Sequence, residues 1–315
     1  MPPPRTGTEV LDLVRKSGFV AGRTLTNFLR THGLLPHDPD EALALCVGGK
    51  ILTDEQAGFI RRGGPAGFRR GKYVLIERLE FAVGEGYHAV HSFVKRRCTL
   101  LMLPRAAVEE TFQPRERGFY ASPPSHFALD HPNVVRMFDI DGDEWGRFLV
   151  LEHLDGKHLR VVLEQAGGRL PVGEACGCAI QAAVGLDHLH QNGVLHQRIS
   201  PVTLFVCESG AVQLLFAGLD RWDLGEHVPS EEEYFAPEQF LDSALLNRCD
   251  CFSLGAVLYR MICGRPPFAT EAELAMKISG RFANVLRSQM RRDGVPPALA
   301  PVLSRMMAVW PEERY

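Results

Sequence analysis

Closely spaced cysteines are the first residues in this chain that could do chemistry, because neighbouring thiolates can hold a metal ion. Cys176 and Cys178 are two residues apart, and so are Cys249 and Cys251. Both pairs fall in segments with helical periodicity, where residues i and i+2 point to different faces. No histidine follows either pair at the spacing of a zinc site. We therefore expect reduced, mostly buried thiols and no metal site.

A basic, glycine-rich segment is the second candidate. Its cationic residues lie at Arg61, Arg62, Arg69, Arg70 and Lys72 and alternate with glycines. This composition is typical of a solvated hinge, and the alternative is a docking patch for an acidic partner. We assign residues 63–72 as a basic linker.

The residues before this linker predict a helical N-terminal extension over residues 1–62. An apolar i, i+3, i+4 pattern begins at Leu25 and stops before a glycine, as in a short amphipathic helix. Asp38 or Asp40 would cap the next helix. Thr53, followed three residues later by a glutamine, predicts a capping box for a further helix.

The pattern changes after the linker. Short apolar and β-branched runs predict strands. These runs lie at residues 73–76, 89–94, 98–103, 134–138 and 148–151. Helical periodicity begins near Val172, and the run from Phe252 to Cys263 is apolar on almost every face, which predicts a buried central helix. A strand-rich region followed by a helical region indicates an α+β fold.

The composition excludes few classes of protein. The chain has 315 residues, with 45% hydrophobic and 23% charged residues, which is ordinary for a globular protein. A net charge of -3 favours neither nucleic acid nor an anionic membrane surface as a partner. The N-terminus lacks the pattern of a secretion signal, and no apolar run is long enough for a membrane segment. We therefore expect a cytoplasmic protein.

Several motifs after the linker resemble the protein kinase family, most closely bacterial serine/threonine kinases of the eukaryotic type. They occur in the family's order at residues 129–135, 148–152, 189–196, 234–239, 250–268 and 311–315. The resemblance implies a bilobal kinase-like domain over residues 73–315, with a small lobe over about 73–152 and a large lobe over about 153–315. Because relatives continue into a final helix, the C-terminal end is expected to be clipped or naturally short.

The resemblance also shows which catalytic side chains are replaced. The degenerate positions are Leu101, Ser122, Arg198, Ser200, Thr203 and Phe216. Phosphoryl transfer depends on charged groups that position the phosphates, the metal and the attacking hydroxyl. Arg198 occupies the position of the catalytic aspartate, but arginine stays protonated and cannot accept a proton. Phe216 occupies the position of a metal-binding aspartate and has no oxygen to offer a hard cation.

The other replacements remove contacts to phosphate. Leu101 stands where the family has a lysine for the phosphates, and Ser122 stands where a helix supplies its glutamate partner. Pro123 follows directly and is expected to break that helix. Ser200 and Thr203 replace the lysine and the metal-binding asparagine of the catalytic loop. Of the family's glycine-rich loop, two glycines remain, in an uncertain register and among glutamates.

A hinge for adenine is implied at Leu151, Glu152, His153 and Leu154, with Leu151 as gatekeeper. A hinge binds adenine through backbone groups, which do not depend on side-chain identity. The sequence therefore predicts no cofactor but leaves ATP binding without magnesium open.

The residues that match the family are structural. They are His196, Gly218, Ala236, Pro237, Glu238, Asp250 and Arg314. The resemblance implies that Glu238 and Arg314 form a buried ion pair and that Asp250 anchors the backbone of the catalytic loop.

Because the catalytic residues are replaced and the structural residues are retained, the sequence favours a pseudokinase that binds a protein partner, either an active kinase or its substrate. One alternative is an atypical enzyme that uses Lys95 with Asp220 or Asp223, and another is nucleotide binding without turnover. The acidic run at residues 231–233 is expected to be a solvated turn, and the alternative is a fixed mimic of a phosphorylated loop. The sequence does not predict the oligomeric state.

Overall fold

The structure is a computed structural model that divides into two compact units. The first comprises residues 1–108 and 138–154, and the second comprises residues 109–137 and 155–315. The residues that it describes are 3–17, 19–20, 22–62, 69–81, 84–103, 129–143, 146–217, 231–240 and 247–315.

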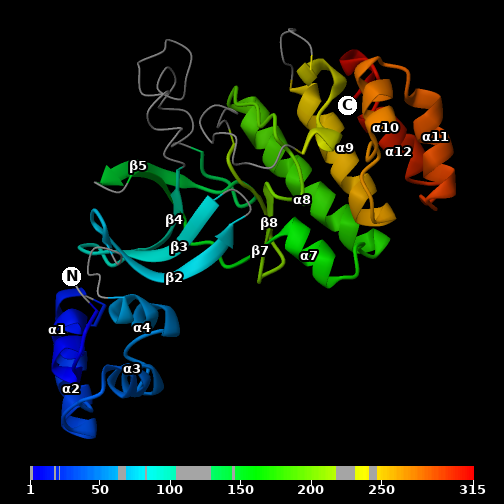
Figure 1. Ribbon diagram of the computed structural model, residues 1–315. Helices are drawn as coiled ribbons and strands as arrows, with labels where there is room; N and C mark the ends of the chain where they lie inside the picture. The colour runs from blue at the N-terminus through cyan, green and yellow to red at the C-terminus, as the bar shows by residue number, and fades with distance from the viewer. Residues whose placement is uncertain are drawn as a thin grey trace. The chain divides into compact units, whose positions relative to one another are not determined.

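The first unit begins with four short helices that share an apolar core (Figure 1). They are α1 (Gly7–Ser17), α2 (Gly22–His32), α3 (Pro39–Gly48) and α4 (Asp54–Arg61). Asp38 caps α3 by accepting from two backbone N–H groups, and the predicted capping box of Thr53 and Gln56 is present at α4. The prediction of helices in this region is confirmed.

A six-stranded sheet follows and curls strongly (Figure 1). Its strands are β1 (Arg69–Arg70), β2 (Tyr73–Phe81), β3 (Gly84–His91), β4 (Arg97–Met102), β5 (Met137–Asp143) and β6 (Gly146–Leu151). The order is β1-β2-β3-β4-β6-β5. The strand predicted at residues 134–138 is misplaced, because β5 begins at Met137 and runs to Asp143.

The alternation of side chains gives this sheet two different faces. One face forms the core of the sheet, which includes Tyr73, Leu75, Tyr87, Ala89, Cys98, Leu100, Phe148 and Val150. The strand registers place the intervening residues on the other face, namely Gly86, His88, Thr99, Leu101, Leu149 and Leu151. This second face therefore carries Leu101 and the strand that leads into the predicted hinge.

Helix α4 covers the outer side of β2, where β1 no longer pairs with it. The Thr53 hydroxyl donates to the Ile76 carbonyl at 3.2 Å, and the Arg78 N–H donates to the Glu55 carboxylate at 2.9 Å. The pairing of β2 with β3 is irregular in the same place, between Leu75 and Glu77. The side chains of Thr53, the N-cap of α4, and of Glu55 thus take the backbone groups that an adjacent strand would have used.

The linker contributes a strand and is not simply a solvated hinge. Arg69 and Arg70 form β1, and Lys72 lies within 3.3 Å of both Asp139 and Asp141 on β5. The hydrogen bond to Asp139 raises the pKa of Lys72. Because aspartates of the same unit already pair with it, Lys72 is a poor candidate for docking an acidic partner. Residues 63–68 lie outside the described part of the chain.

The second unit is mainly helical and is built around α8 and α9 (Figure 1). Its helices are α7 (Leu159–Gln165), α8 (Val172–Gln191), α9 (Arg248–Cys263), α10 (Glu271–Ile278), α11 (Ala283–Arg292) and α12 (Ala300–Met306). Single 3-10 turns are η2 (Glu232–Tyr234), η3 (Pro237–Phe240) and η4 (Pro311–Glu313). Helix α9 is buried along most of its length and ends at Gly264 in a left-handed conformation, which confirms the predicted central helix.

Helix α8, which begins at Val172 as predicted, is also confirmed, but not all of its large apolar side chains are buried. Ala179 and Leu186 are buried, whereas Ile180 and Val184 are 64% and 48% exposed. Small residues such as Ala182 and Gly185 face the core instead, because a Cβ on Gly185 would come within 2.7 Å of the Asn133 carbonyl.

A small sheet of β7 (Gly156–His158), β8 (Leu204–Cys207) and β9 (Val212–Leu214) supports the loops of this unit. The segment after His131 joins it, since the Asn133 side chain donates to the Val212 carbonyl and Val135 N–H donates to the Leu214 carbonyl. The sequence did not predict this sheet. In the described ranges, no helix combines the length and apolar character of a membrane crossing.

Candidate functional site

The predicted catalytic loop is held by one buried carboxylate. Asp250, fully buried on α9, accepts hydrogen bonds from the backbone N–H groups of His196 at 2.9 Å and Gln197 at 2.6 Å. The His190 ring lies 2.8 Å from the same carboxylate. Burial lowers the pKa of His196, so this imidazole is neutral and serves as packing. The predicted contact between Asp250 and the loop backbone is present.

Two residues of this region have strained backbone conformations, Gln197 in the loop and Phe216 shortly after β9. Gln197 and Phe216 have φ values of 64° and 65°, in the left-handed region that non-glycine residues rarely adopt. Such conformations cost about 1–3 kcal/mol each and persist only when the surroundings impose them. The hydrogen bond from Gln197 N–H to Asp250 is one such constraint.

The Thr203 side chain forms its hydrogen bonds within the loop itself. The Thr203 hydroxyl donates to the Arg198 carbonyl at 2.7 Å and accepts from Ser200 N–H at 2.9 Å. Thr203 is 2% exposed. The proton and one lone pair of the Thr203 hydroxyl are therefore used inside the loop.

Arg198, the residue predicted to replace the catalytic aspartate, lies in this loop, and its backbone N–H donates to the His196 ring at 3.4 Å. Phe216 is 6% exposed and contributes only carbon atoms. Across the described residues, no cluster of three or more His, Cys, Asp or Glu side chains is arranged to hold a metal ion.

Glu231 lies against this loop. The Ser200 hydroxyl and the Val202 N–H both donate to its carboxylate, and burial raises the pKa of Glu231 while these bonds oppose the rise. The expectation of a solvated acidic turn is therefore wrong for Glu231, which turns inward because the loop offers it two donors. A carboxylate beside Ser200 is unfavourable for an anionic phosphate at the same place.

The segment after Glu231 is fastened to the rest of the unit by polar contacts. The Arg314 guanidinium lies 2.5 Å and 2.9 Å from the two oxygens of Glu238, so the predicted ion pair is present. Gln239 accepts from Ala236 N–H and donates to the Gln197 carbonyl at 2.7 Å. The sequence argument missed Gln239, which joins this segment directly to the catalytic loop. Pro237 is buried beside it.

Lys277 makes a second contact that holds this segment, and the sequence did not predict it. It lies on α10, is fully buried, and donates to the Glu232 carbonyl. Its ammonium nitrogen also lies over two aromatic rings, 5.1 Å from the centroid of Phe240 and 5.2 Å from that of Phe268. Burial lowers the pKa of Lys277 to about 7. The buried amine thus links α10 to the acidic turn.

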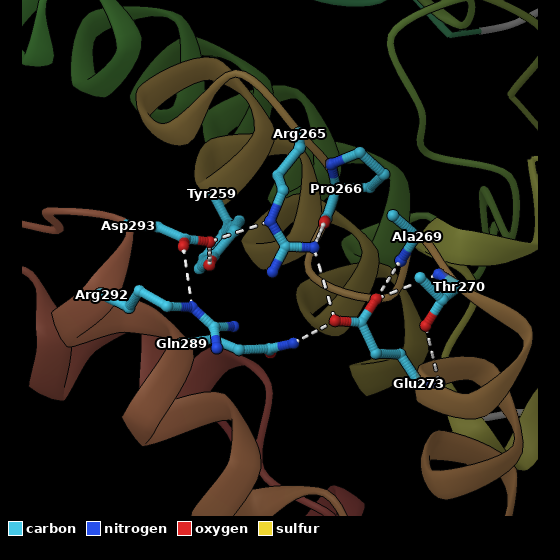
Figure 2. Close-up of polar contacts among 9 residues, drawn as sticks. All are labelled: Tyr259, Arg265, Pro266, Ala269, Thr270, Glu273, Gln289, Arg292 and Asp293. Carbon is cyan, nitrogen blue, oxygen red and sulfur yellow. Dashed lines mark hydrogen bonds and ion pairs between the residues drawn. The ribbon is translucent and has the colours of Figure 1, made fainter.

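A polar cluster holds α10 and α11 against the end of α9, as Figure 2 shows. Arg265 donates to Asp293 at 3.0 Å and lies 3.5 Å from Glu273, and Tyr259 donates to Asp293 at 2.5 Å. Burial by itself would raise the pKa of Asp293, but the bond from Tyr259 and the charge of Arg265 lower it. Because each of these charged groups has a partner within the cluster, we interpret the cluster as structural.

The predicted hinge belongs to the first unit and follows β6. Leu151 pairs with Thr99, and the chain then passes through Glu152 and His153 to Leu154. The Thr99 hydroxyl accepts from Leu154 N–H at 3.0 Å, and the His88 ring lies 2.7 Å from the Leu154 carbonyl. Both backbone groups of Leu154 are therefore engaged by side chains of the sheet.

The remaining positions on this face of the sheet are apolar. Leu101 is fully buried on β4, opposite Gly86 and Leu149. Gly86 lies within strand β3, and a Cβ there would come within 2.3 Å of the Phe81 ring. The glycine is therefore explained by the aromatic ring that packs on it and not by a phosphate.

Several predicted residues take no part in this geometry. Ser122, Gly218, Asp220 and Asp223 lie outside the described residues. Lys95 is exposed at the end of the turn between β3 and β4. All eight cysteines are free, three of them buried and five partly buried, and both closely spaced pairs lie in helices as predicted.

The comparison with protein families decides the relationship. The protein kinase domain matches residues 124–315, which is more than half of the chain. The chain belongs to the protein kinase family. Its α+β fold, with a curled sheet and a helical unit, agrees with that assignment.

Curated relatives of this kinase domain include bacterial serine/threonine-protein kinases. The chain is 27% identical over 199 residues to serine/threonine-protein kinase PknB of Mycobacterium leprae, covering 60% of this chain and 32% of the relative. It is 28% identical over 200 residues to PknB of Mycobacterium tuberculosis strain H37Rv, with the same coverage. It is 27% identical over 263 residues to serine/threonine-protein kinase Pkn1 of Myxococcus xanthus, covering 79% of this chain and 37% of the relative. The chain thus spans about a third of the length of these relatives.

Proposed function

We propose that this kinase domain is a pseudokinase, a binding or regulatory module in serine/threonine kinase signalling that transfers no phosphoryl group. The observation that carries the proposal is the catalytic loop. Asp250 holds its backbone, while Arg198 replaces the proton acceptor and Thr203 is consumed by bonds within the loop. A loop kept in shape without its reactive groups supports a role in binding rather than catalysis.

Charge supports the same conclusion. Phosphoryl transfer requires positive charge and a metal around the phosphates. Here Leu101 and Phe216 are apolar, and the carboxylate of Glu231 bonds to Ser200, which stands at the position of the family's lysine. We accordingly propose that no cofactor is required and that magnesium has no site.

The proposed partner is a protein, either an active kinase or one of its substrates. The family supports this proposal, because relatives of the chain are named serine/threonine-protein kinases. We place the module in the cytoplasm and propose no nucleic-acid partner, in line with a net charge of -3. Affinity capture on the full chain, followed by kinase assays of captured kinases with and without the chain, would identify the partner and its regulation.

The test of the proposal combines thermal melting with a phosphoryl-transfer assay. A ligand at about 100 times its Kd stabilises a protein by roughly 2.7 kcal/mol, which gives a measurable rise in Tm. We expect no rise with millimolar ATP and magnesium, and no radiolabel transfer to itself or to a generic protein substrate. A catalytically active bacterial serine/threonine kinase domain is the positive control.

The two alternatives give different results. A rise in Tm that requires magnesium, together with label transfer, would mean an atypical active kinase and would overturn the proposal. A rise without magnesium and without transfer would mean a nucleotide-binding module, and the regulatory role would then depend on nucleotide.

A further inference from the structure

We propose that Thr99 and His88 act as an internal ligand of the hinge. They occupy the N–H and the C=O of Leu154, so a heteroaromatic base can bind there only by displacing them. The inference rests on the proposed function, because it concerns the hinge of the same kinase domain. It adds the two residues whose side chains occupy that hinge.

The first contact satisfies the donor of the hinge. Leu154 N–H donates to the Thr99 hydroxyl at 3.0 Å, and Thr99 and Leu154 are 0% and 1% exposed. A buried backbone N–H needs a partner, whether from the protein or from a ligand. Because Thr99 supplies that partner, the hinge is complete without a ligand.

The second contact satisfies the acceptor. The His88 Nε2 lies 2.7 Å from the Leu154 carbonyl, which can only accept, so the proton of the ring is on Nε2. The same ring packs on the His153 ring with centroids 4.5 Å apart, and its Nδ1 lies 3.7 Å from the Glu77 carboxylate. His88 is therefore held by the strand before it, by its neighbour in the hinge and by the carbonyl itself.

The strand register explains why these two side chains meet the same residue. His88 on β3 pairs directly with Thr99 on β4, and directly opposed residues of antiparallel strands project from the same face. Thr99 in turn pairs with Leu151, the last residue of β6, from which the chain continues to Leu154. One acceptor and one donor from the sheet thus match one donor and one acceptor of the hinge.

This arrangement defines the ligand that could compete. It must be planar, because it would lie on the apolar face with Leu101 and Leu149, and it must carry an acceptor close to a donor. Adenine and related aminated heterocycles have this chemistry. Each internal hydrogen bond that must be exchanged is expected to weaken binding about tenfold, since a net bond is worth roughly one factor of ten in affinity.

The test uses adenosine, which has the base but no phosphates, so that only the contacts of the base are measured. Binding is measured by calorimetry and by thermal melting, without magnesium. Wild type is expected to show no measurable binding of adenosine at a concentration of about 1 mM. The double variant His88→Phe with Thr99→Val, which keeps ring and side-chain volume but removes both bonds, is expected to bind saturably, with a gain of about a hundredfold.

Two matched controls isolate the bonds from their surroundings. Thr99→Ser retains the hydroxyl and is expected to behave as wild type. His91→Phe lies on the same strand, where the ring accepts from Phe93 and Val94 N–H groups, and is expected to gain no binding. A folded double variant that binds no adenosine, or wild type that binds it as tightly as the variant, would overturn the inference.

A measurement on wild type keeps the inference testable if the double variant does not fold. Hydrogen exchange should show the Leu154 amide protected without any ligand, and the nitrogen shifts of His88 should show a proton on Nε2. A freely exchanging Leu154 amide would refute it. Phosphoryl transfer is assayed separately. Adenosine binding by the double variant without transfer supports the inference and leaves the proposed function intact. Phosphoryl transfer by wild type would overturn the proposed function but not the inference.

Discussion

Removing the carboxylate of Glu238 should destabilise the domain strongly, although no chemistry depends on it. The Arg314 side chain is fully buried and that of Glu238 is 11% exposed. Arg314 also donates to the carbonyls of Arg248, Ala308 and Val309 and lies 5.0 Å over the Phe252 ring. In Glu238→Ala these neutral contacts remain, but the cation loses its only countercharge among the described residues.

The expected loss follows from leaving one buried charge alone, which costs about 3–5 kcal/mol. With a urea m-value of about 2 kcal/mol/M, the unfolding midpoint should fall by roughly 1.5–2.5 M. Far-UV circular dichroism in urea measures this directly. Glu313→Ala removes an exposed carboxylate next to Arg314 and should change the free energy of unfolding by less than about 0.5 kcal/mol.

A double variant separates the lost pair from the stranded charge. Glu238→Ala with Arg314→Met removes both charges and should lose clearly less than the sum of the two single variants. An unchanged midpoint in Glu238→Ala, or strict additivity in the double variant, would refute this account of the pair.

Three further predictions concern buried groups of the two units. Leu101→Lys places an ammonium on a fully buried strand and should lower Tm without restoring ATP binding or transfer, and a variant that melts no lower and binds ATP would reveal a latent active site. Burial lowers the pKa of Lys277 to about 7. Above that pH the folded protein has lost the proton of this side chain, whereas the unfolded chain still holds it. The free energy of unfolding should therefore rise by about 1.4 kcal/mol per pH unit from about pH 7 to 8.5. Urea midpoints of Lys277→Met across this range should lack the rise, and an equal slope would contradict the assignment. Burial also lowers the pKa of His158 to about 4, so its contribution to stability should be lost as pH falls from about 6.5 to 4, and His158→Asn should flatten that part of the acid profile.

The sequence predicted best those features that depend on local pattern or on motifs of the family. The capping box at Thr53, the apolar α9 and the Glu238–Arg314 pair are of this kind. Each depends on residue types that have few alternative uses, such as a threonine ahead of a helix or an uninterrupted apolar run.

Contacts set by strand register or by tertiary burial could not be predicted in this way. Thr99 and His88 are distant from Leu154 in sequence, and only the pairing of β3, β4 and β6 brings them to it. Lys277 and Glu231 are charged residues that sequence reasoning places on the surface. Each turns inward because a distant element supplies a partner, namely the Glu232 carbonyl for Lys277 and the catalytic loop for Glu231.

The contact between α4 and β2 has a consequence for self-association. An uncovered strand edge presents free N–H and C=O groups and is a template for pairing with another chain. Here Thr53 and Glu55 cap the edge at Ile76 and Arg78 by side-chain hydrogen bonds. A protein expressed from Arg69 onward would expose this edge, and we expect it to self-associate more readily than the full chain.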